Sequence, residues 1–253
     1  MNSSTRFSLR PLIITGSDTS VGKTVLSALF LTLARELGIH LMPLKPFCSG
    51  GREDAKVLQS LAFPSNGSTV DIDRVNPWHF ELPLAPYLAA HPDYPFPTLK
   101  AVLGWIQNEA SNRNKLIIEG AGGLLSPLGK DYTILDIGTN LHAKFVVVVA
   151  NRLGAINQAR LCIATLESFG VGDFLLCLNH KHQEGDDLSR KTNTEVIKNL
   201  VGDERFIGLE NINLEEIEDN FGRPLKISKK LLAGTRSCDK TIHVLCDALK
   251  ETR

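Results

Sequence analysis

Residues suited to binding phosphate lie together in one short stretch of the sequence. Between Gly16 and Thr24 the chain reads Gly-Ser-Asp-Thr-Ser-Val-Gly-Lys-Thr. The backbone N–H groups of such a loop suit a polyphosphate, Lys23 would lie on the β- and γ-phosphates, and the Thr24 hydroxyl would bind magnesium. Five residues, rather than the usual four, separate Gly16 from Gly22. The stretch predicts a phosphate-binding loop, the alternative being an ordinary strand-to-helix turn.

A lysine and a glutamate end two other apolar runs. Lys45 follows Leu41–Leu44, and Glu119 closes the run Lys115–Glu119. Glu119 resembles a carboxylate that holds magnesium at the edge of a sheet, although a helix-capping or surface glutamate is the alternative. Lys45 would be a second cation on a transferred phosphoryl group, or a surface lysine whose ammonium reaches solvent.

Two further polar residues leave alternatives open. Asp54 precedes a helical stretch, so it is either a second metal carboxylate or the N-cap of that helix. Asn179 follows the run Phe174–Leu178, so it either reads a base edge or occupies a turn. If the runs form parallel strands, their carboxyl ends meet at one edge, where ligands bind in such sheets.

The elements that position these residues alternate between strand and helix. We expect strands at 12–15, 41–45, 115–119, 144–150, 174–178 and 205–207, and helices at 22–37, 55–62, 85–90, 99–109, 134–141, 155–169, 191–201 and 240–250. Residues 45–51 read as a loop, and the proline-rich segment 63–97 reads as irregular. The pattern predicts one α/β domain over 1–253, with a mainly parallel central sheet flanked by helices in the three-layer arrangement of P-loop NTPases. Residues 1–10 read as a flexible leader.

Composition excludes several classes of function. The 28 Lys and Arg residues balance the 28 Asp and Glu residues, which argues against nucleic-acid or membrane-surface partners. The five cysteines form no Cys-x-x-Cys pair, as expected in a reducing compartment. The longest apolar run, Phe145–Ala150, is too short to span a bilayer, and residues 1–10 lack the apolar core of a secretory signal. We expect a cytoplasmic protein.

Five motifs together resemble the dethiobiotin synthetase family of biotin biosynthesis. The resemblance covers about Leu12 to Gly208, and the five-residue spacing in the phosphate-binding loop is the family's own form. The motifs are residues 15–24; Lys45-Pro-Phe-Cys-Ser-Gly; Val75-Asn-Pro-Trp with Pro83-Leu-Ala-Pro; Glu119-Gly-Ala-Gly-Gly; and Leu153-Gly-Ala-Ile-Asn.

The resemblance implies an ATP-dependent cyclo-ligase that uses Mg²⁺. Its substrates would be 7,8-diaminopelargonic acid, CO₂ and ATP. A carbamate forms on one amine, ATP phosphorylates it, and the second amine closes a cyclic urea as phosphate leaves. The resemblance also implies a homodimer with the active site near the interface.

The resemblance further implies roles for individual residues. Lys23, Lys45 and Thr19 match catalytic positions, and Thr24, Asp54 and Glu119 match the metal site. Nucleotide contacts are implied for Ser20, Val21, Gly22, Lys23, Thr24, Val25, Asp54, Glu119, Gly120, Ala121, Gly122, Asn179, His180, Gly208, Leu209 and Glu210. Substrate contacts are implied for Ser49, Thr19, Leu153, Gly154, Ala155, Ile156 and Asn157, the last five presenting backbone N–H groups to the substrate carboxylate from the neighbouring subunit.

Some features differ from the family pattern. The loop from Lys45 to Asp54 is short, Arg152 replaces the usual lysine, and Gly208–Glu210 lacks the proline of the family's second base-binding loop. The competing hypothesis is a partitioning-type P-loop ATPase that acts as a switch. That class usually carries a signature lysine five positions before Lys23, where this chain has Asp18.

Overall fold

The computed structural model describes residues 10–62, 69–90, 96–110, 115–180 and 187–210, together with Val244, Asp247 and Ala248. The expected leader therefore lies outside the described residues, except for Arg10, and so does most of the expected terminal helix at 240–250. Within the described part, no helix is both long enough and apolar enough to cross a bilayer.

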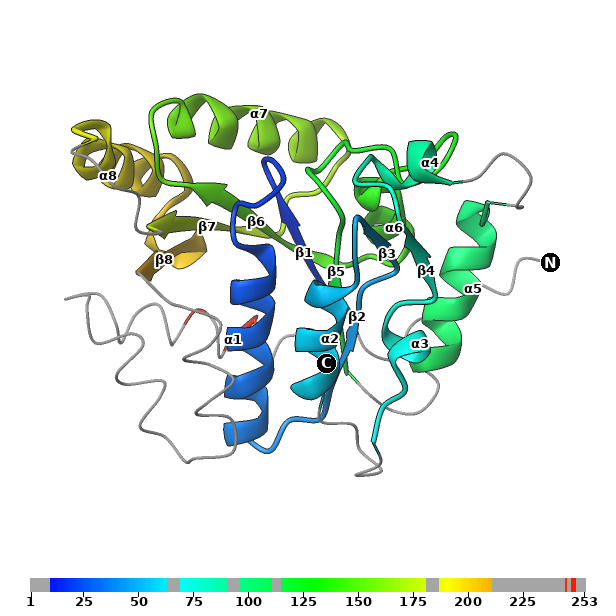
Figure 1. The fold of residues 1–253 in the computed structure, drawn as a ribbon. Helices are drawn as coiled ribbons and strands as arrows, with labels where there is room; N and C mark the ends of the chain where they lie inside the picture. Colours follow the sequence, from blue (N-terminus) through cyan, green and yellow to red (C-terminus); the bar gives the residue numbers. More distant parts are fainter. Residues whose placement is uncertain are drawn as a thin grey trace.

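A six-stranded parallel sheet forms the centre of the molecule (Figure 1). The strand order is β2-β5-β1-β6-β7-β8, so the first strand of the chain lies inside the sheet between β5 and β6. The strands are β1 (Leu12–Gly16), β2 (Leu41–Leu44), β5 (Lys115–Glu119), β6 (Lys144–Ala150), β7 (Phe174–His180) and β8 (Phe206–Glu210). Because all neighbours are parallel, every carboxyl end lies at one edge. This confirms the predicted fold class.

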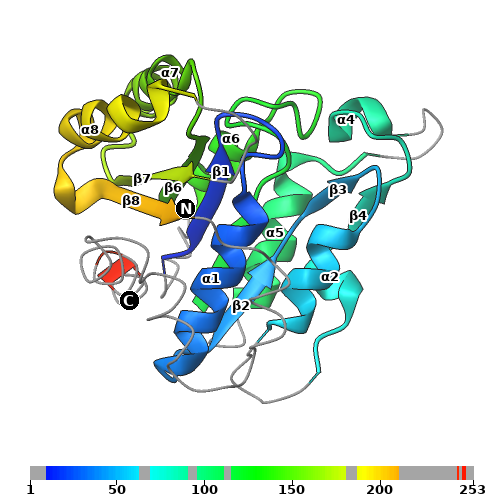
Figure 2. The ribbon, with the colours of Figure 1, turned by 60° about the vertical axis from the view of Figure 1, so that its left-hand side comes forward.

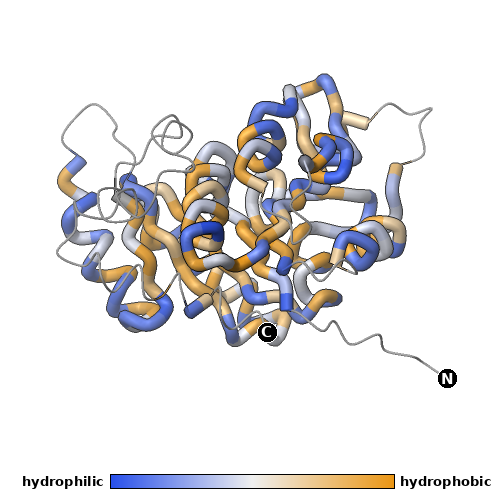
Figure 3. The backbone as a smooth tube through the Cα atoms, turned by 90° about the horizontal axis from the view of Figure 1, so that it is seen from below, coloured by the Kyte–Doolittle hydropathy of each residue, from blue (hydrophilic) through white to orange (hydrophobic). Residues whose placement is uncertain are grey.

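Helices cover both faces of the sheet, with α1 and α7 on opposite sides (Figures 1 and 2). The central strands are buried from both directions, as the run Phe145–Val149 predicts. Apolar residues accordingly concentrate along the strands and the inner sides of the helices (Figure 3). The longer helices are α1 (Lys23–Glu36), α2 (Glu53–Ser60), α5 (Leu99–Ala110), α6 (Ile134–Asn140), α7 (Ala155–Ser168) and α8 (Ser189–Val201). The short ones are α3 (Ile72–Val75), α4 (Pro86–Ala89) and the 3₁₀ turn η1 (Asp203–Arg205).

The predicted loop at 45–51 contains a strand, so that prediction is wrong. β3 (Phe47–Ser49) pairs in parallel with β4 (Trp78–Phe80), which lies in the segment expected to be irregular. The Phe47 ring stacks on Trp78 at 5.3 Å and on Phe96 at 5.7 Å between ring centroids. The pair is held by contacts between distant parts of the chain, which local sequence patterns do not reveal.

The last two strands extend further than predicted. β7 continues through Asn179 to His180, and β8 continues to Glu210. The backbone of Leu209 pairs with that of Asn179 in the parallel register. Asn179 is therefore not a turn residue, and Gly208–Glu210 forms an edge strand rather than a loop.

Candidate active site

The phosphate-binding loop connects β1 to α1 in a strained backbone conformation. Ser20 has φ 55° and Gly22 has φ 100°, both in the left-handed region. A side chain at Gly22 would also collide with Asn179, because a Cβ built there lies 2.1 Å from Asn179 Nδ2. The same amide donates to the Val21 carbonyl at 2.9 Å. The loop therefore requires glycine here, and Asn179 fixes its shape from the end of β7.

Lys23 is held within the loop that carries it. Its ammonium donates to the Asp18 carbonyl at 2.9 Å, and the residue is 7% exposed. Burial, and then the nearby Lys45 ammonium, lower the pKa of Lys23 from 10.5 to about 8. Two cations thus lie close enough to influence each other at the carboxyl edge of the sheet, an arrangement suited to a polyanionic ligand.

Glu119 is the centre of a buried hydrogen-bonded cluster. Its carboxylate accepts hydrogen bonds from Thr24 Oγ1 at 2.9 Å, Ser27 Oγ at 2.7 Å and Lys45 Nζ at 2.6 Å. Glu119 is 1% exposed and Lys45 is 3% exposed. A surface position is therefore ruled out for both residues, and Glu119, inside β5, caps no helix. Sequence patterns singled out Lys45 at the end of β2, Glu119 on β5 and Thr24 on α1, and these three residues meet in this cluster.

Asp54 joins this cluster from α2. Its carboxylate lies 2.9 Å from Lys45 Nζ and its side chain is 53% exposed. Although burial alone would raise the pKa of Asp54, the Lys45 ammonium and the Thr24 hydroxyl hold it below its ordinary value. Burial alone would likewise lower the pKa of Lys45, but Glu119 and Asp54 raise it well above its ordinary value.

The N-cap alternative for Asp54 is wrong. The N-cap position of α2 is Arg52, and Asp54 lies inside the first turn. Its carboxylate, the Glu119 carboxylate and the Thr24 hydroxyl are all oxygen donors, the ligands that Mg²⁺ prefers. The donor set fits a magnesium ion completed by water and phosphate. No cluster of three or more His, Cys, Asp or Glu side chains suited to a metal occurs in the described part of the chain.

The glycine-rich loop after β5 packs directly on the phosphate-binding loop. Gly120 N–H donates to the Ile14 carbonyl, and Leu124 N–H donates to the Gly16 carbonyl, each at 2.9 Å. A Cβ at Gly123 would lie 3.2 Å from the Ser17 carbonyl oxygen. The close backbone approach explains the run of small residues Gly120–Gly123, because larger side chains would separate the two loops.

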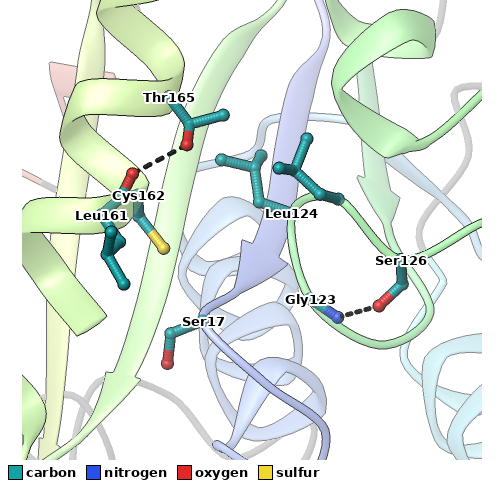
Figure 4. A pocket seen from close by; sticks show the side chains of 8 residues that line it. Ser17, Gly123, Leu124, Ser126, Leu161, Cys162 and Thr165 are labelled. Carbon is teal, nitrogen blue, oxygen red and sulfur yellow. Dashed lines mark hydrogen bonds between the residues drawn. The ribbon is translucent and has the colours of Figure 1, made fainter.

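A cavity of about 310 Å³ lies between these loops and α7 (Figure 4). It is lined by Ser17, Gly123, Leu124, Leu125, Ser126, Leu161, Cys162 and Thr165. Two of the lining leucines are largely solvent-exposed, Leu125 at 56% and Leu161 at 60%. The cavity therefore has an apolar rim that faces outward, while the two loops contribute the serines Ser17 and Ser126 to its lining.

Residues expected to contact substrate come from three parts of the fold: the phosphate-binding loop, β3 and the start of α7. Thr19 is exposed at the tip of this loop, where its N–H donates to Asp18 Oδ1 at 2.7 Å. Ser49 ends β3 and is half-buried. The segment Leu153–Asn157 includes the N-cap and the first residues of α7, and the preceding residue, Arg152, lies 3.6 Å from Asp18 of the phosphate-binding loop.

Not every N–H group of that segment can contact a ligand. The Leu153 N–H already donates to Asp187 Oδ2 at 3.0 Å, and the Ala155 N–H donates to the Arg152 carbonyl at 3.0 Å. The remaining N–H groups at 154, 156 and 157 lie where a helix start leaves donors without intrahelical acceptors. These three groups are the backbone donors of the segment that could contact an anion.

The expected base contacts are grouped at the ends of β7 and β8. Asn179 is buried and uses one N–H on the phosphate-binding loop, so only part of its amide remains for a base. His180 Nδ1 lies 2.9 Å from Asn151 Nδ2. Leu209 is buried at 0% exposure, so its side chain cannot contact a ligand.

Sequence reasoning missed several residues that shape the site. Ser27 follows Thr24 by one helical turn, so helical periodicity alone would have placed its hydroxyl near Glu119. Asn76, Asn151 and Asn193 are also buried and bind backbone carbonyls or one another. Asn76 lies within the motif Val75–Trp78, although its contact with the Lys45 carbonyl was not predicted. Asn151 and Asn193 gave no local signal, because Asn151 binds the Arg190 carbonyl and Asn193 binds Asn151, both distant in sequence.

The strand, loop and helix around Lys23, with Glu119 on the neighbouring strand, define a P-loop nucleotide-binding protein of the α/β class. A family model described as an AAA domain matches residues 10–214. Among solved structures, MinD cell division protein from Aquifex aeolicus matches with a TM-score of 0.55 and 18% identity, covering 96% of this chain and 98% of that chain. At this identity the likeness shows the shared fold alone.

Curated relatives define the family more narrowly. ATP-dependent dethiobiotin synthetase BioD of Bacillus subtilis (strain 168) is 32% identical over 195 residues, covering 77% of this chain and 84% of that protein. The protein of the same name from Methanocaldococcus jannaschii is 30% identical and covers 85% of this chain and 100% of its own length. The chain belongs to the ATP-dependent dethiobiotin synthetase family, which confirms the resemblance drawn from its motifs.

Proposed function

We propose that the protein forms dethiobiotin from 7,8-diaminopelargonic acid, CO₂ and ATP. One amine adds to CO₂ and loses a proton, giving a carbamate. A carbamate oxygen attacks the γ-phosphorus, and ADP leaves. The second amine then attacks the carbonyl of the mixed anhydride, inorganic phosphate leaves with the carbamate oxygen, and the amine proton is released as the ring closes.

The contact between Lys45 and Glu119 beside Lys23 carries this proposal. A carbamate and a γ-phosphate are both anionic, so their approach requires cations between them. Lys23 reaches the site from the phosphate-binding loop and Lys45 from the end of β2. The pKa of Lys45 is raised by its carboxylate partners, so it remains charged at any physiological pH. We assign Lys23 and Lys45 to the transferred phosphoryl group and Thr19 to the carbamate.

Thr24, Asp54 and Glu119 would hold Mg²⁺ with the nucleotide phosphates. The ion would supply charge neutralisation at the phosphates. Glu119 orients the Thr24 hydroxyl through their 2.9 Å hydrogen bond, and Ser27 fixes the other carboxylate oxygen. The protein's own contribution is thus to present three oxygen donors in a fixed arrangement.

The nucleotide would extend from the phosphate-binding loop toward the ends of β7 and β8. Ser20 to Val25 surround the phosphates, with backbone of Gly120–Gly122 on the opposite side. Asn179, His180 and the backbone of Gly208–Glu210 lie where a base would reach. We propose ATP as the nucleotide, in keeping with the name of the related enzymes.

The diamine would lie between Ser49, Thr19 and the start of α7. Its carboxylate would be bound by N–H groups from the segment Leu153–Asn157, with those of Gly154, Ile156 and Asn157 as the donors. We further propose a cytoplasmic homodimer in which this segment serves the neighbouring active site. The exposure of Leu153 at 81%, Leu161 and Leu125 supports an interface close to the site.

The test is ADP release measured with and without the diamine. We expect release to require diaminopelargonate, bicarbonate and Mg-ATP together, and to yield a product of dethiobiotin mass. A P-loop switch would instead hydrolyse ATP without the diamine, and that result would refute the proposal.

A further inference from the structure

We propose that Asn193, on α8, is a positioning residue for the segment Asn151–Gly154 and thereby sets how tightly the enzyme holds the carboxylate of the diamine. The inference rests on the proposed function, because it concerns the substrate of that reaction. Asn193 lies on a helix that contributes no side chain to the phosphate or metal site described above. Its effect would be transmitted through the Asn151 side chain and the Arg152 carbonyl, to which its amide donates.

Asn193 is a polar residue on an otherwise apolar face. The buried residues of α8 are Asn193, Ile197 and Val201, which recur every four residues and face the sheet. At 3% exposure an asparagine is costly unless its amide is hydrogen-bonded. An aliphatic residue would continue the face without this requirement, so the amide indicates a role beyond packing.

The Asn193 amide binds the segment at two successive residues. Its Nδ2 donates to Asn151 Oδ1 and to the Arg152 carbonyl, each at 3.0 Å. Asn151 is itself 2% exposed, and its Nδ2 donates to the Arg190 carbonyl at 3.0 Å. A buried network whose members are hydrogen-bonded to one another specifies a single arrangement of the chain that it holds.

The residues after Asn151 lead into the segment to which we assign the carboxylate of the diamine. The Arg152 side chain reaches Asp18 of the phosphate-binding loop, and the Leu153 N–H is held by Asp187. The direction of the N–H groups that follow, from Gly154 onward, therefore depends on a backbone anchored by Asn193. Losing the anchor would weaken carboxylate binding, while Lys23 and Lys45 would still act at the amine end of the substrate.

The discriminating experiment compares the diamine acid with its primary amide, in which the carboxylate is replaced by a neutral group. We expect the wild-type enzyme to favour the acid by about tenfold or more in kcat/KM, as a charged hydrogen-bonded anion requires. In Asn193→Asp and Asn193→Leu, this preference should fall by about threefold to tenfold, through a rise in KM for the acid. The preference is a ratio within one enzyme, so it does not depend on the folded fraction.

Thr192→Ala is the matched control, because its exposed hydroxyl bonds only within α8, to the Ser189 carbonyl. It should keep the wild-type preference. An unchanged preference in both Asn193 variants would overturn the positioning role. If wild-type enzyme released no ADP in response to the acid, the proposed function itself would fall, which is a distinct outcome.

Discussion

Replacing Lys45 by glutamine should damage both stability and chemistry. Lys45 Nζ lies 2.6 Å from Glu119 and 2.9 Å from Asp54, with the lysine almost fully buried. In Lys45→Gln, Glu119 keeps the hydroxyl bonds from Thr24 and Ser27 but loses its cation. A buried carboxylate without a countercharge is strongly unfavourable.

The size of the loss follows from this geometry. Removing one member of a buried ion pair typically costs about 3–5 kcal/mol. A glutamine amide that still donates to Glu119 would recover about 1 kcal/mol. Asp54 adds little to the loss of stability, because its side chain is half-exposed and solvent screens its charge. We therefore expect the free energy of unfolding to fall by about 2–4 kcal/mol in Lys45→Gln.

Urea unfolding followed by two independent probes measures this change. Lys56→Gln is the control, since Lys56 is an exposed lysine of α2 that lies 3.5 Å from Glu53; it should change stability by less than about 0.5 kcal/mol. The double variant Lys45→Gln/Glu119→Gln should cost less than the sum of the single variants, because it removes the unpaired charge. Product formation should be lost in Lys45→Gln while nucleotide binding is retained. The reasoning would be refuted if the loss of unfolding free energy in the double variant equalled the sum of the two single losses, or if Lys45→Gln turned over substrate like the wild-type enzyme.

Three further predictions concern the phosphate and metal groups. Gly22→Ala should abolish nucleotide binding in a titration with a fluorescent ATP analogue, because its Cβ would meet Asn179. The control Gly38→Ala, which has open space around it at φ 68°, should cost only about 1–2 kcal/mol of stability. Tight nucleotide binding by Gly22→Ala would contradict this prediction. The pKa of Lys23 is lowered to about 8, so its charge is present below pH 8 and lost above it. ATP affinity should therefore fall as pH rises from 8 to 9.5, and calorimetry should detect proton uptake on binding. Lys23→Arg should give a flat pH profile, and an equally flat profile in the wild-type enzyme would contradict the prediction. Glu119→Ala should raise the Mg²⁺ concentration for half-maximal activity by about tenfold or more, and an unchanged magnesium titration would remove Glu119 from the metal site.

Much of the site could be predicted because parallel strands bring their carboxyl ends to one edge. Apolar runs predicted β1, β2 and β5, and the residues that follow or end them, Lys23, Lys45 and Glu119, meet as expected. The motif-based resemblance then correctly indicated the family, because the spacing of its phosphate-binding loop is unusual.

The strand β3, which was not predicted, and the alternatives left open for Asn179 and Asp54 share one physical cause. Asn179 belongs to a strand because it pairs with β8, and the carboxylate of Asp54, inside α2, contacts Lys45 rather than the start of the helix. β3 exists because Phe47 stacks on aromatic residues distant in sequence. Such contacts are decided by tertiary structure, so propensity and periodicity cannot reveal them.

Isotope transfer from bicarbonate to phosphate tests the central claim most directly. In a short reaction with ¹⁸O-labelled bicarbonate, diaminopelargonate and Mg-ATP, the proposed route places one label in inorganic phosphate, because the carbamate oxygen leaves with the phosphoryl group. The cyclic urea should retain a second label in its carbonyl. If the oxygen added to the phosphoryl group came from water and carried no label, ATP would be merely hydrolysed, and the account would be contradicted.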